Sequence, residues 1–267
     1  MTTPAFGGEV SEFYQRFRRG YPPEAADEPA AAFTLTRDDV VLDLGCGTGR
    51  LTRVLAARTG AVLGMDPEPA MLAQARQATS APNVGWLLGA DTDVSALSPL
   101  FGHGRLAAVT VAQALHWMDH ERLFSAVRPL LRPGGGIAVV TNGEPLWLQD
   151  TAWSATLRDV VSAYLGTPLR STCGTDTASQ ERYAAALSAA GYAVDQRVVE
   201  YATTLTVEEI VGGVFSAMSP GQLRPSTRDR RSPTASGRRW PRTHRSARRS
   251  GCGSSPEPGE RSLMANA

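Results

Sequence analysis

The chain has 267 residues, of which 27 are basic and 26 acidic, and its net charge is +1. This length accommodates one large α/β domain, or one domain with an appendage. No apolar run approaches the roughly 20 residues that cross a bilayer, and Met1–Gly8 lacks the basic and apolar regions of a secretory signal, so we expect a cytoplasmic protein without a membrane segment.

In chain order, residues 10–33 predict two short helices that are broken at Pro22-Pro23. Between Asp39 and Asn142 the chain contains five short runs rich in Val and Leu, and these runs are nearly continuous instead of alternating with polar residues. Such runs are typical of strands that are buried on both faces of a parallel sheet. The predicted strands are Val40–Leu44, Ala61–Met65, Val84–Leu88, Leu106–Ala112 and Ile137–Thr141.

Amphipathic stretches separate these runs, and we expect helices there. Because strands and helices alternate, the sequence predicts a Rossmann-like, doubly wound α/β fold with a mostly parallel sheet and helices on both faces. A turn at Pro133-Gly134-Gly135-Gly136 is predicted to stop one helix and to precede the fifth strand. The predicted helices are Thr48–Arg58, Glu68–Gln77 and His120–Leu131.

After the fifth strand, the chain returns to longer helical patterns and one further apolar run. We divide the chain into an N-terminal helical lid at residues 1–35, a main domain at 36–222 and a tail at 223–267. The predicted elements of this part are helices at Trp147–Leu165, Ser179–Ala190 and Val207–Met218, and a sixth strand, which may be bent, at Ala193–Leu205.

The tail is strongly basic, whereas the residues before it are mildly acidic, and every basic residue of the chain is arginine. Residues 224–262 contain almost no aliphatic side chains, so they cannot bury enough apolar surface to offset the entropy lost on ordering. Three interpretations stay open. The tail is an out-of-frame translation of a GC-rich gene, which we favour, or a disordered appendage, or an arm that neutralises nucleic-acid phosphates.

The strongest chemical signal is Asp43-Leu44-Gly45-Cys46-Gly47-Thr48-Gly49, which joins the first strand to the first helix. Glycines allow positive φ and a close approach of the backbone to a ligand, and a helix start presents free N–H groups. A tight structural turn would need no acidic residue at this place. A carboxylate at Asp43 could bind a cationic group such as the ammonium of a methionine moiety, whereas it would repel a pyrophosphate.

Acidic residues also follow the second and third strands. Asp66 lies about 20 residues beyond the glycine turn, where a carboxylate can bind both hydroxyls of a ribose, although Asp66 could instead cap the next helix. In Gly89-Ala90-Asp91-Thr92-Asp93, an Asp could accept a hydrogen bond from the amino group of an adenine, but the segment could also be an ordinary turn.

With Met65-Asp66-Pro67 and Leu130-Leu131-Arg132-Pro133-Gly134-Gly135, the glycine motif resembles the class I S-adenosylmethionine-dependent methyltransferases. Two further segments resemble a small-molecule branch that includes proteins similar to trans-aconitate methyltransferase. They are Tyr14-Gln15-Arg16-Phe17-Arg18-Arg19-Gly20-Tyr21-Pro22 and Gln113-Ala114-Leu115-His116-Trp117. The resemblance covers about residues 8–220.

The resemblance implies a seven-stranded sheet with S-adenosylmethionine over the carboxyl ends of strands one to four. Similar proteins end with another helix and a last strand; that strand is expected to be missing here, which would leave the sixth strand with an exposed edge. The implied cofactor-binding residues are Asp43, Gly45, Cys46, Gly47, Gly49, Asp66, Pro67, Asp91, Thr92 and Gln113. The implied substrate-side residues are Tyr14, Tyr21, His116, Trp117 and Trp147.

His116 is the candidate general base, because an unperturbed histidine could take a proton from a hydroxyl or amine acceptor. It could equally only pack beneath the cofactor, since a carboxylate acceptor needs no base and orientation can supply most of the rate. Trp147, Trp153 and Tyr164 could cover an aromatic or apolar acceptor, or could be core. The cysteines are few and widely spaced, so no disulfide framework or metal site is predicted, and Cys173 is interpreted as structural.

The predicted function is therefore methylation of a small molecule, an organic acid or a secondary metabolite, with O- or N-methylation favoured over C-methylation. The acidic main domain argues against nucleic acid as substrate, and the sequence leaves monomer and homodimer open. Two rival functions remain. The chain could bind the cofactor without catalysis, or it could be a nicotinamide-dependent oxidoreductase, although Gly-x-Gly-x-Gly lacks the spacing of the dinucleotide fingerprint.

Overall fold

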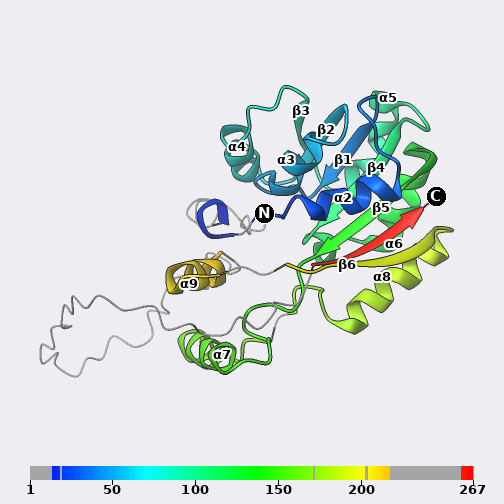
Figure 1. Cartoon of the computed structure of the whole chain (residues 1–267). Coiled ribbons are helices and arrows are strands. Elements are labelled where there is room, and N and C mark those ends of the chain that lie inside the picture. The colour runs from blue at the N-terminus through cyan, green and yellow to red at the C-terminus, as the bar shows by residue number, and fades with distance from the viewer. Residues whose placement is uncertain (1–13, 19, 171, 202–203, 217–259, 267) are drawn as a thin grey trace, which may run out of the picture.

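The computed structural model describes residues 14–18, 20–170, 172–201, 204–216 and 260–266 (Figure 1). Its centre is a seven-stranded sheet with the order β3-β2-β1-β4-β5-β7-β6. The order reverses beside β1, which is the topology of a doubly wound sheet, so the predicted fold class is confirmed. The strands are β1 (Val40–Leu44), β2 (Ala61–Asp66), β3 (Val84–Leu88), β4 (Leu106–Ala112), β5 (Leu131–Thr141), β6 (Ala193–Val199) and β7 (Glu260–Asn266).

The first five strands are parallel, and β7 lies antiparallel between β5 and β6 (Figure 1). The expectation that β6 has no neighbour is therefore wrong, because Glu260–Asn266 pairs with it along its whole length. The amino-acid composition did not reveal this strand. A strand between two others is held by backbone hydrogen bonds on both edges, and any sequence without proline can form them. The rest of the predicted tail, residues 223–259 and 267, lies outside the described residues.

The helices connect the strands close to where the sequence predicts them. The first predicted helix of residues 10–33 falls partly outside the described residues, and residues 14–17 are helical. Residues 217 and 218 of the last predicted helix also lie outside them. The α-helices with labels are α2 (Glu24–Ala32), α3 (Arg50–Ala56), α4 (Pro69–Gln77), α5 (Ser98–Phe101), α6 (His120–Val127), α7 (Ala152–Leu165), α8 (Thr177–Ala189) and α9 (Val207–Phe215). The 3₁₀ helices are η1 (Asp91–Leu97), η2 (Leu115–Trp117) and η3 (Arg128–Leu130).

Two boundaries differ from the prediction for backbone reasons. Helix α3 begins at Arg50 and not at Thr48, because Gly49 has a φ of 73°, outside the helical region. Strand β5 begins at Leu131, where a helix was expected to end, because Leu131 already pairs with Leu106 of β4. Residues 133–136, predicted as a turn, lie within this strand, and the ladder absorbs them by a register shift between Leu106 and Ala108.

Two apolar clusters cover the two faces of the sheet. Leu42, on one face of β1, packs with Phe124 of α6 and Leu187 of α8, whereas Val41, on the other face, packs with Leu51 of α3. Adjacent strand residues point to opposite faces, which explains why both are fully buried. Helix α2 belongs to the second cluster through Ala26 and is followed there by Phe33.

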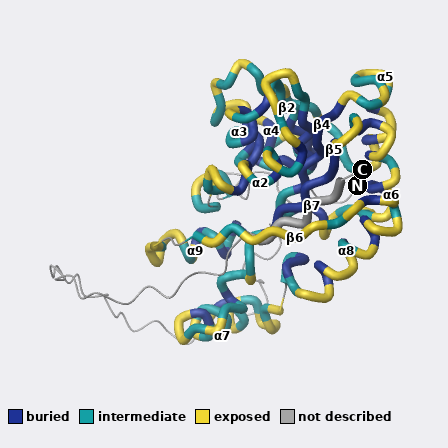
Figure 2. The backbone as a smooth tube through the Cα atoms, turned by 45° about the vertical axis from the view of Figure 1, so that its right-hand side comes forward, coloured by how far each residue is buried: buried dark blue, intermediate teal, exposed yellow. Residues whose placement is uncertain are grey.

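Helices α7 and α9 form a third and smaller cluster beside the sheet, apart from the two main ones (Figures 1 and 2). Its buried members are Trp147, Val161 of α7 and Val214 of α9. The rings of Tyr164 and Phe215 meet edge to face at 6.2 Å between their centroids. Figure 2 shows these helices mostly in the colours of intermediate and exposed residues, while most residues of β1, β4 and β5 are buried.

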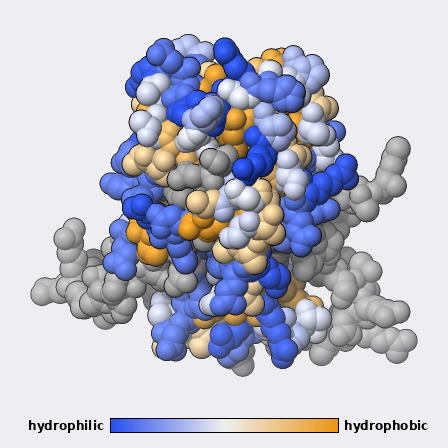
Figure 3. Space-filling model, turned by 90° about the vertical axis from the view of Figure 1, so that its right-hand side faces the viewer, coloured by the Kyte–Doolittle hydropathy of each residue, from blue (hydrophilic) through white to orange (hydrophobic). Residues whose placement is uncertain are grey.

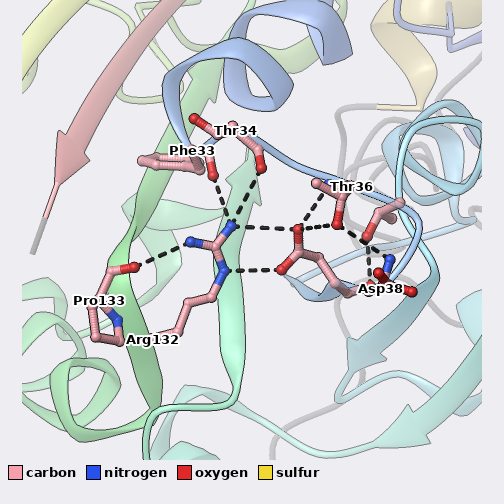
Figure 4. Close-up of polar contacts among 8 residues, drawn as sticks. Phe33, Thr34, Thr36, Asp38, Arg132 and Pro133 are labelled. Carbon is pink, nitrogen blue, oxygen red and sulfur yellow. Dashed lines mark hydrogen bonds and ion pairs between the residues drawn. The ribbon is translucent and has the colours of Figure 1, made fainter.

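The amino ends of β1 and β5 are tied together by Arg132 and Asp39 (Figure 4). Nε of Arg132 donates to Oδ1 of Asp39 at 2.9 Å, and its Nη2 donates to the backbone oxygen of Phe33 at 2.9 Å. Burial alone would raise the pKa of Asp39, but hydrogen bonds from Arg132 and Thr36 outweigh it and hold this pKa below its usual value. This network fixes the end of the sheet opposite the glycine turn.

The face on the right-hand side of Figure 1 is mainly hydrophilic, and its hydrophobic side chains lie in separate small patches (Figure 3). In the part of the chain that the structure describes, none of the helices combines the length and the hydropathy that a membrane crossing requires.

Candidate functional site

In the glycine turn after β1, every second residue has a left-handed backbone conformation. Gly45, Gly47 and Gly49 have φ values of 66°, 54° and 73°, a region that only glycine adopts without strain. A Cβ at Gly45 would lie 2.5 Å from Cβ of Ala114, and one at Gly49 would lie 2.4 Å from the ring of Trp86. At Gly47 the nearest atom would be 3.8 Å away, on the ring of Tyr14, so a Cβ there would make only an ordinary van der Waals contact.

Asp66, at the carboxyl end of β2, connects this turn to the start of α4. Its Oδ2 accepts a hydrogen bond from the N–H of Gly47 at 2.8 Å, and its Oδ1 accepts one from the N–H of Glu68 at 2.9 Å. Burial raises the pKa of Asp66, and the two N–H donors oppose that effect. Asp66 thus precedes α4 without being its N-cap residue, which is Glu68, and it also lines a cavity.

Asp43 is fully buried beneath the turn. Its Oδ2 accepts a hydrogen bond from the hydroxyl of Thr52 at 2.5 Å, and its Oδ1 accepts one from the hydroxyl of Thr110 at 2.7 Å. Burial raises the pKa of Asp43 to about 6, against the lowering effect of these two hydroxyls. Asp43 also lines a narrow crevice of about 20 Å³ together with Gly45, Cys46, Tyr14 and Tyr21.

A larger cavity of about 280 Å³ opens beside the glycine turn, at the carboxyl ends of β1, β2 and β4. Open α/β sheets bind ligands at this edge, where the strand order reverses, and the volume is close to the lower end of the roughly 300–1,000 Å³ of small-molecule sites. Eight predicted residues line it: Tyr14, Gly45, Gly47, Asp66, Pro67, Gln113, His116 and Trp117.

Gln113, directly after β4, is held in an unusual conformation at the centre of the site. Its φ is 54°, its N–H donates to the backbone oxygen of Val140 at 3.0 Å, and it lines both the cavity and the crevice. A residue other than glycine in this region costs on the order of 1–3 kcal/mol, and such residues cluster at ligand sites. This strained residue lies where the larger cavity and the crevice adjoin.

His116 lies on η2 at the wall of the cavity, with its ring centroid 4.9 Å from that of Trp117. Desolvation of the ring, and then the charge of Arg18, lower the pKa of His116 to about 4, although the residue as a whole is exposed. At neutral pH the ring is therefore uncharged.

The remaining predicted residues lie in other places. Asp91 accepts a hydrogen bond from the N–H of Asp119 at 3.3 Å, and Thr92 is exposed; neither lines the cavity. Gly49 is covered by Trp86, so it shapes the turn. Trp147 is buried and lines a second, smaller cavity of about 110 Å³.

The smaller cavity adjoins the larger one, because Arg18, Gln113 and Cys173 line both. The loop after β5 and helix α9 supply its other walls, including Asn142 and Val214. The Oδ1 atom of Asn142 is buried without a hydrogen-bond partner within the described structure, so it can accept one from a ligand.

Sequence reasoning missed several wall residues. Cys173, interpreted as structural, has a φ of 53° and lines both cavities from the loop before α8. Arg18 and Met71 also line the larger cavity. Arg18 was visible within the Tyr14–Pro22 segment, but no local pattern indicated Cys173 or Met71, because the fold alone brings them to the site.

The comparisons with known proteins agree with this geometry. A family model described as a methyltransferase domain matches residues 41–135. Over 232 residues the chain is 34% identical to an uncharacterised methyltransferase of Mycobacterium tuberculosis, an alignment that covers 85% of this chain and 83% of that protein. It is 42% identical over 102 residues to the trans-aconitate 2-methyltransferase of Deinococcus radiodurans, which covers 37% of this chain and 36% of that enzyme.

Among solved structures, the YcgJ protein of Bacillus subtilis superposes with a TM-score of 0.51 and 15% identity, over 91% of this chain and 97% of that one. At this identity the similarity concerns the fold. It supports the strand order that places the glycine turn, Asp66 and Gln113 at one edge of the sheet.

Proposed function

The chain belongs to the class I S-adenosylmethionine-dependent methyltransferases, and on that basis we propose that it methylates a small organic acid or a secondary metabolite. The observation that carries the proposal is the cavity beside Gly47 and Asp66, into which Gln113, His116 and Trp117 also face. Its size suits a small ligand, and β4, η2 and the helical segment at residues 14–17 surround it.

The residues present suit the cofactor. Gly47 lines the larger cavity with a positive φ, and its lack of a side chain lets a ligand approach the backbone closely. Asp66 offers a carboxylate to ribose hydroxyls, and Asp43 and Asn142 offer oxygen atoms to an ammonium group at the crevice. We propose that Gly45, Cys46 and Pro67 complete this cradle, and that Asp91 or Thr92 approaches the adenine from the end of β3.

The cofactor supplies a methyl group on a positively charged sulfur. The protein's contribution is to hold the acceptor in line with that group and to exclude water. This orientation can supply most of the rate acceleration when no proton must be transferred. We assign the acceptor to the smaller cavity, because that cavity adjoins the larger one at Arg18, Gln113 and Cys173. Trp147, Tyr14 and Tyr21 then enclose the two ligands.

We propose that His116 acts as a proton acceptor only for a hydroxyl or amine acceptor. With a pKa of about 4 its ring is uncharged at neutral pH and can accept a hydrogen bond, but it is a weak base. A carboxylate acceptor is already ionised at that pH and needs no base. The low pKa of His116 therefore favours O-methylation of an acid.

Calorimetric titration of the purified full-length protein with S-adenosylhomocysteine, with NADH as the comparison ligand, tests the proposal. We expect a micromolar dissociation constant for S-adenosylhomocysteine and no heat of binding for NADH, because Asp43 lies where a pyrophosphate would need positive charge or free N–H groups. A protein that binds NADH alone would overturn the assignment of the glycine turn.

A further inference from the structure

Arg18, like Gln113, lines all three of the spaces described above, and of these two residues only Arg18 carries a charge. It follows the helical turn at residues 14–17 and lines the larger cavity, the smaller cavity and the crevice beside Asp43. Its charge also contributes to the lowered pKa of His116, which places the guanidinium near the wall of the cavity. Arg18 therefore lies where the cofactor and the acceptor must meet.

The side chain is oriented but not fully paired. Its Nε donates to the hydroxyl of Ser216 at 3.0 Å, and that hydroxyl donates in turn to the backbone oxygen of Gly213. The guanidinium carbon lies 5.3 Å from the centroid of the Tyr14 ring. Within the described structure, the two terminal amino groups of Arg18 have no hydrogen-bond partner, and five N–H donors in a fixed plane normally find several.

Two other charged side chains that line the smaller cavity and the crevice already have hydrogen-bond partners. Glu209 accepts hydrogen bonds from the N–H and hydroxyl of Thr206, and Glu144 is exposed. Arg50, in the crevice, donates to the backbone oxygens of Tyr14 and Gln15. Arg18 is thus a half-buried cation whose terminal N–H groups remain available to a ligand.

We propose that Arg18 is the carboxylate-binding residue of this site. Two parallel N–H groups of a guanidinium fit the two oxygens of a carboxylate, and Ser216 fixes the plane through Nε. The carboxylate belongs either to the methionine end of the cofactor or to the acceptor, since Arg18 lines both the crevice and the smaller cavity. The inference rests on the proposed function.

The test compares Arg18→Met and Arg18→Lys with the control Arg16→Met. Arg16 lies on the same helical turn and also contacts α9, through Glu208 at 2.8 Å, but does not line the cavities. Each protein is titrated with S-adenosylhomocysteine, with 5′-methylthioadenosine, which lacks the carboxylate, and with trans-aconitate as an anionic probe in the presence of saturating S-adenosylhomocysteine.

We expect Arg18→Met to weaken the binding of one of the two carboxylate ligands at least tenfold and to leave the binding of methylthioadenosine unchanged. The control Arg16→Met should bind both carboxylate ligands with wild-type affinity. Weaker binding of S-adenosylhomocysteine identifies the carboxylate of the cofactor as the group that Arg18 binds. Weaker binding of trans-aconitate alone identifies the carboxylate of the acceptor. Arg18→Lys keeps the charge without the planar fork and should fall between the two.

Wild-type affinities for both carboxylate ligands in Arg18→Met would overturn the inference. An equal loss for methylthioadenosine would overturn it as well, because it would show a structural role for the side chain. If the wild-type protein binds neither nucleoside, the proposed function itself fails, so the two failures are distinguishable.

Discussion

Gly212 of α9 lies directly against the ring of Phe17: a Cβ atom at Gly212 would be 2.1 Å from Cγ of that ring. The next residue, Gly213, has no atom within 4 Å of the corresponding position. Together with the Arg16–Glu208 ion pair, this close approach attaches residues 14–18 to a helix about 190 residues later. Helix α9 thereby holds Tyr14 and Arg18 at the cavity.

We expect Gly212→Ala to displace Phe17 and to lower the free energy of unfolding by about 1–3 kcal/mol, the usual cost of overpacking. Gly213→Ala is the matched control: on the same helix it should be neutral or stabilising by up to about 1 kcal/mol, since alanine favours helix. Urea denaturation of both variants measures the difference. Equal stabilities would show that Phe17 does not pack on α9 in solution.

Asp66→Ala should weaken binding of S-adenosylhomocysteine by about 1–3 kcal/mol, because it removes charged hydrogen bonds at the ribose position and releases the N–H of Gly47. Asp91→Ala, at the end of the next strand, tests the adenine assignment in the same titration. Thermal unfolding of each variant separates loss of binding from loss of fold. Unchanged affinity in Asp66→Ala would contradict the ribose assignment.

The buried carboxyl of Asp43 should make stability depend on pH. Its folded pKa, about 6, lies above the reference value of 3.8, so its contribution is fully present below pH 3.8 and is lost as the pH rises through 6. The difference between the wild type and Asp43→Asn should change by about 3 kcal/mol across this range. Asp66, whose pKa is also raised, is present in both proteins, and its charge contributes to the raised pKa of Asp43.

Urea denaturation at pH 4, 5, 6 and 7 measures this difference. In the same window, the affinity of the wild type for S-adenosylhomocysteine should rise with pH, because an ionised Asp43 attracts the ligand's ammonium group, and Asp43→Asn should abolish that rise. Parallel stability curves for the two proteins would show that Asp43 has an ordinary pKa in the folded state.

Gln113→Gly should stabilise the fold while weakening the ligand site. Glycine removes the strain of a φ of 54°, which is worth on the order of 1 kcal/mol, and it also removes a side chain from the wall of the cavity. We expect a higher urea midpoint and a weaker affinity for S-adenosylhomocysteine in the same variant. A lower midpoint would mean that the contacts of the Gln113 side chain outweigh the strain.

His116 should stay uncharged at pH 6. In a proton NMR titration, the ring resonance that disappears in His116→Gln should have a midpoint near 4, and this midpoint should rise in Arg18→Met as the neighbouring positive charge is removed. A midpoint near the ordinary value of about 6.5 would restore His116 as an efficient general base at neutral pH.

The sequence predicted β1 and β4 well because burial on both faces leaves a run of apolar residues, whereas β3 has such a run although none of its residues is fully buried. The bounds of β1, β3 and β4 agree with the prediction residue for residue. Helix starts were less accurate, because a φ value such as that of Gly49 has no periodic signature. Strand β7 was missed since its apolar run, Leu263-Met264-Ala265, is only three residues long, and its partners lie far away in the chain.

The candidate site was predictable where the ligand-facing residues sit directly after a strand, as Gly45, Asp66 and Gln113 do. Cys173 comes from a loop that folds back over the site, and Ser216 acts only through Arg18. Such residues depend on tertiary contacts that no spacing rule describes. The roles of the individual predicted residues remain predictions that the titrations above would decide.

The position of β7 has a consequence for the order in which the protein can assemble during synthesis. The strands that carry the glycine turn, Asp66 and Gln113 are all made before Gln149, whereas β7, which joins β6 to β5, is made last. At ribosomal rates of about 5–20 residues per second, this interval lasts on the order of 10 s. During that interval the nascent chain presents the free edge of β5 to the cell, and a bound cofactor could already protect the half of the sheet that is complete.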